Sequence, residues 1–377
     1  MKIAIVYDVI YPYVKGGVEK RVWELAVRLT HRGHEVHLFG MKSWEGDDIL
    51  ISKGVFLHGV CPAQKLYEGG RRTIWQAIDF SLYVIKPLMN EKFDIIDCQQ
   101  FPYFSCFSAK LISKLRKTPL VITWHEVWGE YWYDYLGWKG FGGKITERLV
   151  ARLTANNVAV SLTTKINLKS LDYHRQITII PNGVDLQHIR FINPSDEPSD
   201  IIFAGRLIKE KHVELLVRAF GILSPEQPQL RLLIIGEGPE LDAITKIIRE
   251  LSLEDRIVLR GFSVDHDEVI AWMKSSKVFV NPSTREGFGI TALEALACGI
   301  PVVTVDHPAN AIRDLINKKN GFTCSLSEKD LADTIRIALQ RYTQMKNDCI
   351  ASASAYDWEK ITSDNEEYYL SVIEKQV

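Results

Sequence analysis

The stretch PSTREGFGITALEA, residues 282–295, predicts a strand-to-helix unit of a parallel sheet. A short apolar run at 278–280 comes before it, and an apolar-rich segment that begins near Gly289 continues to Gly299. A β-branched run, a glycine-containing loop and a helical segment in that order are typical of α/β proteins. Because ligands of such sheets bind outside the carboxyl ends of the strands, this loop is the first candidate for a functional site.

Two glutamates stand out in this unit, Glu286 in the loop and Glu294 in the helix. A rise of ~1.5 Å per residue would separate their carboxylates along the helix axis by roughly 9 Å or more. Helix N-terminal amides bind phosphate, and here they belong to the loop and first turn, Gly287, Phe288, Gly289 and Ile290. Either glutamate alone would be read as an ordinary surface acid. Together they predict a cradle for a sugar, a diphosphate and a ribose.

A second charged loop reads Gly205-Arg206-Leu207-Ile208-Lys209-Glu210-Lys211 and follows the apolar run at 201–204. Arg206 offers a planar guanidinium group that can donate two parallel hydrogen bonds, and Lys211 offers a compact positive charge. Both suit a diphosphate. The alternative is a solvated charge run at a helix start. Cations are unfavourable there unless an anion is near, so we expect Arg206 and Lys211 to bind phosphate.

The same alternation of strand and helix extends along the whole chain. Its 377 residues suit two domains of roughly 180 residues, and the polar, proline-rich stretches at 181–183 and 193–200 mark the boundary. We expect two doubly wound Rossmann-like domains facing each other across a cleft, at 1–185 and 196–356. The expected strands lie at 3–7, 35–39, 94–98, 120–123, 158–161 and 178–180, then at 201–204, 231–235, 257–259, 278–280 and 301–304.

The composition excludes several classes of protein. The formal net charge of -1 argues against nucleic-acid binding. The six cysteines form no C-x-x-C pair, which favours reduced cytosolic thiols over disulfides or a zinc site. Neither a signal peptide nor a run of ~18 apolar residues is recognisable. We therefore expect a cytoplasmic protein, free or peripheral on the inner face of the cell membrane.

The spacing of Glu286 and Glu294 is an E-x7-E motif. With the loop at 205–211 it resembles the large family of retaining GT-B glycosyltransferases that includes bacterial mannosyl- and glucosyltransferases (family 4, group 1). Further matches follow in family order and span nearly the whole chain: Gly16-Gly17-Val18-Glu19, Pro181-Asn182-Gly183-Val184-Asp185 and Ile235-Gly236-Glu237-Gly238-Pro239. The resemblance also implies a C-terminal helix within 357–377 that crosses back to the first domain.

The resemblance implies retaining transfer of a hexose-type sugar from a UDP-, GDP- or ADP-sugar to a lipid, glycan or small-metabolite acceptor, without a metal or another cofactor. Arg206 and Lys211 would hold the diphosphate, Glu286 the sugar hydroxyls and Glu294 the ribose. Further donor contacts would come from the amides of Gly16 and Gly17 and, near the base, from Gly261 and Phe262. His125, directly after a strand, matches the cleft histidine of the family; the alternative is a structural histidine.

One segment departs from the family pattern. Asp306-His307-Pro308-Ala309-Asn310 stands where the family usually carries a Gly-Gly loop and a glutamate, which puts details near the phosphate in question. No carboxylate nucleophile is evident. Stabilisation of the leaving diphosphate by Arg206, Lys211 and the helix dipole is therefore the favoured mechanism, with His125 and Glu286 completing the catalytic set.

Other readings of the sequence remain open or are set aside. A GT-B nucleotide-sugar epimerase shares the architecture, and a non-catalytic binding protein would be expected to have lost some of the four charged residues. The run His31-x2-His34-x2-His37 need not converge on a metal, because Gly33 turns the chain. Asp265-His266-Asp267 resembles a metal-binding D-x-D but is better explained as the start of a helix.

An aromatic stretch occupies 124–141 and is followed by basic residues. It could line an acceptor site or touch a bilayer interface, or it could be a loop and helix packed on the cleft wall. A peripheral membrane contact of the first domain would use the basic side chains Lys139, Lys144, Arg148 and Arg152, with a second cluster at Lys65, Arg71 and Arg72.

Overall fold

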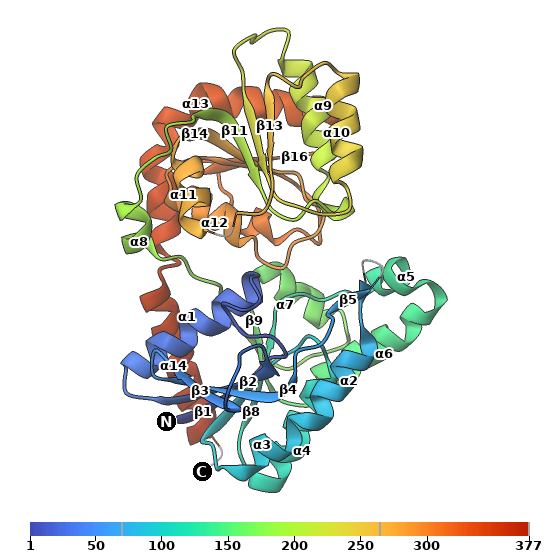
Figure 1. The fold of residues 1–377 in the computed structure, drawn as a ribbon, viewed down its shortest axis with the longest axis vertical. Coiled ribbons are helices and arrows are strands. Elements are labelled where there is room, and N and C mark those ends of the chain that lie inside the picture. Colours follow the sequence, from blue (N-terminus) through green and yellow to red (C-terminus); the bar gives the residue numbers. More distant parts are fainter. Residues whose placement is uncertain (69–70, 264, 376–377) are drawn as a thin grey trace. The chain divides into compact units, whose positions relative to one another are not determined.

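The computed structural model describes residues 1–68, 71–263 and 265–375. The chain divides into two compact units, one of Met1–Asn182 with Trp358–Val377 and the other of Gly183–Asp357 (Figure 1). Each unit is built on a mainly parallel sheet covered by helices, as expected for Rossmann-like domains. The predicted α/β fold class is confirmed.

The second unit begins at Gly183, ahead of the expected start at 196. The segment 183–195 contains α8 (Leu186–Phe191) and is bonded to the second unit at both of its ends. Val184 N donates to Tyr356 O at 2.9 Å, and Ser195 N donates to Ala271 O at 3.0 Å. Because buried backbone groups need partners, these bonds attach the proline-rich segment to the second unit.

The sheet of the first unit has eight strands in the order β10-β9-β8-β7-β1-β2-β4-β3. All pairs are parallel except β3 with β4, which are antiparallel. The sequence patterns did not predict β3 and β4, because glycine, histidine and polar residues interrupt their apolar runs. The strands are β1 (Lys2–Val6), β2 (Glu35–Lys42), β3 (Ile49–Ser52), β4 (Val55–Pro62), β7 (Ile95–Gln99), β8 (Leu120–Trp124), β9 (Asn156–Ala159) and β10 (Ile177–Ile179), and a separate hairpin joins β5 (Tyr67–Glu68) to β6 (Arg71–Arg72).

Helices cover this sheet, and the C-terminal helix is one of them. Figure 1 shows α14 (Trp358–Glu374) beside α1 (Gly17–His31). Tyr369 on α14 donates to the buried Asp97 Oδ2 at 2.5 Å, and Arg32 pairs with Glu366 at 3.0 Å. The predicted return of the C-terminal helix to the first unit is confirmed. The remaining helices are α2 (Ile74–Tyr83), α3 (Ile85–Asn90), α4 (Phe104–Arg116), α5 (Tyr131–Leu136), η1 (Gly137–Lys139), α6 (Gly140–Ala151) and α7 (Leu162–Lys169).

The second unit has six parallel strands in the order β13-β12-β11-β14-β15-β16. Since all six are parallel, the loops that follow them meet at one edge of the sheet. The strands are β11 (Ser199–Ala204), β12 (Leu232–Ile235), β13 (Ile257–Arg260), β14 (Ser276–Asn281), β15 (Val302–Val305) and β16 (Gly321–Cys324). The helices after α8 are η2 (Lys209–Lys211), α9 (Val213–Leu223), α10 (Leu241–Glu250), α11 (His266–Lys274), α12 (Ile290–Ala297), η3 (Ala311–Leu315) and α13 (Glu328–Ser354).

Candidate functional site

The N-terminus of α12 opens at the carboxyl edge of the second sheet. Gly289 is its N-cap and has φ +91°, a left-handed conformation that L side chains rarely adopt. A Cβ at this position would lie 2.3 Å from Ile312 Cγ1, so only glycine fits. The first turn of α12 therefore begins at this edge of the sheet, where helix N-termini can bind an anion.

Glu286 lies in the loop between β14 and α12 and is held by its backbone. Its N–H donates to Ala309 O at 3.0 Å, and its carbonyl accepts from Ala311 N at 2.9 Å. The segment 306–310, which departs from the family pattern, is thus the backbone support of this loop. The buried Asn310 anchors that segment by donating from Nδ2 to Thr304 Oγ1 and Val305 O, at 2.9 and 2.8 Å.

Lys211 and Glu286 converge although they are far apart in the sequence. Lys211 Nζ forms an ion pair with Glu286 Oε1, which also accepts from Asn281 Nδ2 at 3.2 Å. The two loops are tied together: Ser283 Oγ and Thr284 N both donate to Glu210 O at 3.0 Å. A cation and a carboxylate therefore sit side by side at this edge.

Glu294 lies on α12 with its side chain only 2% exposed. His266 Nε2 contacts Glu294 Oε1 at 2.9 Å. Asp265 is the N-cap of α11 and accepts from Asp267 N at 2.9 Å, so the predicted helix start is confirmed. The sequence analysis missed His266 as a partner of Glu294, because the contact joins α11 to α12.

The loop after β13 is positioned by the motif at 235–239. Phe262 N donates to Glu237 Oε1 at 3.2 Å, and the Phe262 ring is exposed. Gly236 comes so close to the loop after β11 that a Cβ there would lie 1.9 Å from Gly205 O. The residues predicted to bind the donor from this unit thus lie in loops that follow its parallel strands or, for Ile290 and Glu294, on α12. Arg206 is exposed, and Gly261 lies beside Phe262.

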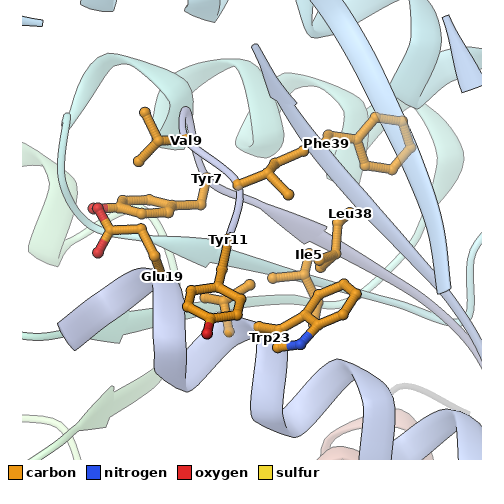
Figure 2. A pocket seen from close by; sticks show the side chains of 10 residues that line it. Ile5, Tyr7, Val9, Tyr11, Glu19, Trp23, Leu38 and Phe39 are labelled. Carbon is orange, nitrogen blue, oxygen red and sulfur yellow. The ribbon is translucent and has the colours of Figure 1, made fainter. Parts of the chain in front are cut away.

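In the first unit, Gly16 and Gly17 stand at the N-terminus of α1. A Cβ at Gly16 would lie 2.4 Å from Glu19 Oε2, so glycine allows the carboxylate to approach the backbone. Figure 2 shows the Glu19 carboxylate beside the Tyr7 hydroxyl, and both residues line a small, mostly apolar cavity. Tyr7 Oη donates to Glu19 Oε1 at 3.5 Å. Burial, followed by the charge of Glu19, raises the pKa of Tyr7 well above its usual value.

His125 follows β8 directly, as predicted. Its Nε2 contacts Gln99 Oε1 at 2.8 Å, so Nε2 carries the proton and Nδ1 is an acceptor. Burial first, and then the positive charge of Arg21, hold the pKa of His125 well below its usual value. The imidazole is therefore uncharged near neutral pH.

A buried ion pair near the end of β1 was missed by the sequence analysis. Asp8 has no exposed surface, pairs with Arg72, and accepts from Gln76 Nε2 at 3.0 Å. Burial is the largest effect on the pKa of Asp8 and raises it. The position of Asp8 directly after the predicted strand at 3–7 was the available signal. The Arg71 side chain lies outside the described residues. Of the second basic cluster, the structure describes a half-buried Arg72 and an exposed Lys65.

The aromatic stretch is largely a packed cluster around a buried acid. Trp128 packs against Trp132 at a tilt of 44°, with ring centroids 4.6 Å apart. Glu147 is fully buried and accepts from Trp128 N and Tyr103 Oη, both at 2.8 Å. Trp138 stands outside this cluster and is 82% exposed.

Two Rossmann-like units with charged loops at the carboxyl edges of their sheets define the GT-B architecture. Solved structures of this architecture align with nearly the whole chain. Sucrose-phosphate synthase from Thermosynechococcus elongatus is 20% identical, with a TM-score of 0.82 over 99% of both chains. Anabaena HepE in complex with UDP-glucose is 18% identical, with a TM-score of 0.75 over 98% of this chain and 100% of that one.

Family comparisons cover both units. The model of glycosyltransferase family 4 matches residues 15–188, and that of glycosyl transferases group 1 matches residues 185–355. The chain belongs to this family of glycosyltransferases. One similar curated protein is the gpi3 subunit of phosphatidylinositol N-acetylglucosaminyltransferase from Schizosaccharomyces pombe, 24% identical over 98% of this chain and 80% of that protein.

Proposed function

We propose that this glycosyltransferase moves a hexose-type sugar from a nucleotide-diphosphate sugar to its acceptor, with retention and without a catalytic metal. The observation that carries the proposal is the convergence of Lys211 and Glu286 in the loops that precede α12, whose N-cap Gly289 makes no side-chain hydrogen bond. A cation, a helix N-terminus and a carboxylate suit a diphosphate and the hydroxyls of its sugar. The UDP-glucose complex of a protein with the same fold supports a nucleotide-sugar donor.

In this proposal Lys211, Arg206 and the α12 dipole stabilise the negative charge that develops on the departing diphosphate. Lys211 would exchange its ion pair with Glu286 for the phosphate, which frees the carboxylate to accept from the sugar hydroxyls. Glu294, oriented by His266, would accept from the ribose. A departing phosphate oxygen would take the acceptor proton on the face from which the nucleotide leaves, and the configuration at the anomeric carbon would be retained.

The donor is tested by thermal shift with UDP-, GDP- and ADP-sugars in the presence of EDTA. One nucleotide class should raise the melting temperature, because a ligand that binds only the folded state stabilises it. The shift should be lost in Glu294→Ala and reduced in His266→Ala. Glu250→Ala, an exposed acid at the end of α10, should keep the full shift.

The stereochemistry is tested in the same preparation, once a donor and an acceptor are in hand. Proton NMR of the fresh product should show the anomeric configuration of the donor, and an inverted product would refute retention. Accumulation of an epimeric sugar nucleotide without acceptor would indicate the epimerase reaction instead. No thermal shift with any donor, in the wild type as in Glu294→Ala, would contradict the cradle.

We further propose a lipid acceptor and a location on the inner face of the cell membrane. Among the described residues no helix combines the length and apolar character needed to cross a bilayer. However, α6 carries an exposed apolar stripe of Phe141, Ile145 and Leu149, spaced four residues apart. The basic side chains Lys144, Arg148 and Arg152 form the adjacent stripe, the pattern of a helix that lies in a bilayer interface. The similarity to a subunit of a phosphatidylinositol-modifying transferase supports a lipid acceptor.

The wild-type protein should co-float with vesicles containing anionic lipid at low salt, and added salt should weaken binding because it screens the charges. Phe141→Ser with Leu149→Ser should abolish co-flotation. Phe191→Ser is the matched control, since Phe191 is an aromatic of the second unit that is 78% exposed. Failure of the wild type to bind anionic vesicles at low salt would refute the membrane contact.

A further inference from the structure

We propose that His37, His58 and Glu91 form a binding site for a divalent transition-metal ion, with Zn²⁺ as the ion of best fit. His37 on β2 and His58 on the adjacent β4 face each other, with His37 Nδ1 2.7 Å from His58 Nε2. One ligand atom from each of the three residues lies within 4.8 Å of the others. His37 lies beside Ala4 near the amino-terminal ends of the strands, whereas His125 follows the carboxyl end of β8.

The ring of His37 is held in place from several sides. It stacks on Phe56 with ring centroids 4.7 Å apart and meets Phe93 edge-on at 5.2 Å. Its Nε2 contacts Glu35 Oε1 at 2.9 Å. A metal-bound histidine characteristically donates its second N–H to a carboxylate in this way, which directs the lone pair of the other nitrogen to the ion. Here that lone pair is on Nδ1, which faces His58.

The charges around the cluster favour a cation. Two carboxylates face the pair, Glu35 and Glu91, against the single ammonium group of Lys2. The Lys2 side chain is 28% exposed and can turn into solvent, so a metal ion would take over its contact with Glu91.

The donor set selects the class of ion. Two imidazoles and one carboxylate suit Zn²⁺, whereas Mg²⁺ and Ca²⁺ prefer oxygen ligands throughout. In a tetrahedral Zn²⁺ site with Zn–N distances of about 2.0–2.1 Å, two ligand nitrogens lie roughly 3.3 Å apart. His37 Nδ1 and His58 Nε2 are 2.7 Å apart, so the two rings would need to separate by less than about 1 Å. Water would complete the coordination. The site would stabilise the first unit and would take no part in sugar transfer.

The test is metal titration of the full chain after EDTA treatment and removal of the chelator. Zn²⁺ in competition with a chromophoric chelator should bind with one equivalent per chain, and Co²⁺ should give the visible absorption of a tetrahedral site. Both signals should be lost in His58→Gln and weakened at least tenfold in Glu91→Gln. His34→Gln is the matched control. His34 directly precedes β2 and contacts Glu366 at 2.7 Å, so this change should leave binding unchanged.

A further variant separates a metal site from a hydrogen-bonded histidine pair. Lys2→Ala removes the competing ammonium group and should tighten Zn²⁺ binding severalfold. Absence of stoichiometric binding by the wild type, or equal binding by His58→Gln, would overturn the proposal, as would weaker binding by Lys2→Ala. If His58→Gln does not fold, Glu91→Gln decides alone, because the Glu91 side chain is 35% exposed and its loss leaves the strands intact.

Discussion

Replacing Lys211 by alanine is expected to lower kcat for sugar transfer by about 10²–10³-fold, the usual effect of removing one preorganised group that stabilises transition-state charge. In the structure the ammonium group is held against Glu286 by the loops at 209–212 and 283–286, so it is in place before the donor arrives. Its removal leaves the departing diphosphate with Arg206 and the helix dipole alone. Steady-state kinetics with the donor found in the thermal-shift panel is the measurement.

The matched control for this variant is Lys209→Ala. Lys209 begins the same turn, η2, and its side chain is exposed, so it should keep near-normal transfer. Lys211→Ala should still fold, because Asn281 continues to donate to the Glu286 carboxylate. Near-normal kcat in a folded Lys211→Ala enzyme would contradict leaving-group stabilisation by this residue.

The largest effect on stability is expected for Arg21→Ala. Arg21 is 1% exposed within the first unit and donates to Asn182 Oδ1 at 3.1 Å and to Pro181 O. Its charge also acts on the buried Asp97, whose pKa is raised chiefly by burial. Removing one member of such a buried polar group costs about 3–5 kcal/mol of unfolding free energy, because partners are left unpaired. Urea unfolding followed by circular dichroism would measure the loss.

Arg32→Ala is the control for Arg21→Ala. Arg32 directly follows α1 and pairs with Glu359 and Glu366, but its side chain is 25% exposed and that of Glu359 67%. Ion pairs open to solvent contribute about 0–1 kcal/mol, so the expected loss is small. Equal destabilisation by the two variants would contradict the assignment of Arg21 as the buried centre of this unit.

The strands that the sequence predicted correctly include those with uninterrupted β-branched or aliphatic residues, such as β8 and β12. It missed β3 and β4 at the edge of the first sheet, and β16 at the edge of the second. Strands at or next to the edge of a sheet carry exposed or polar residues, so the hydrophobic pattern by which a strand is recognised in the sequence is weak there. The assignment of 183–195 to the second unit depended on hydrogen bonds to Tyr356 and Ala271, which no local pattern encodes.

The sequence by itself determined the class of this protein and the loops that carry its charged residues. The E-x7-E spacing and the glycines at 287 and 289 can be recognised in a short stretch of sequence. They act locally, because the left-handed conformation of Gly289 and the start of α12 depend on neighbouring residues. Only the tertiary structure decided which distant groups meet: Lys211 with Glu286, His266 with Glu294, Asp8 with Arg72, and His37 with His58. The register of the parallel strands and the packing of separate helices set these contacts. Both depend on the free energy of burying apolar surface, which is a property of the whole chain and not of any short stretch of it.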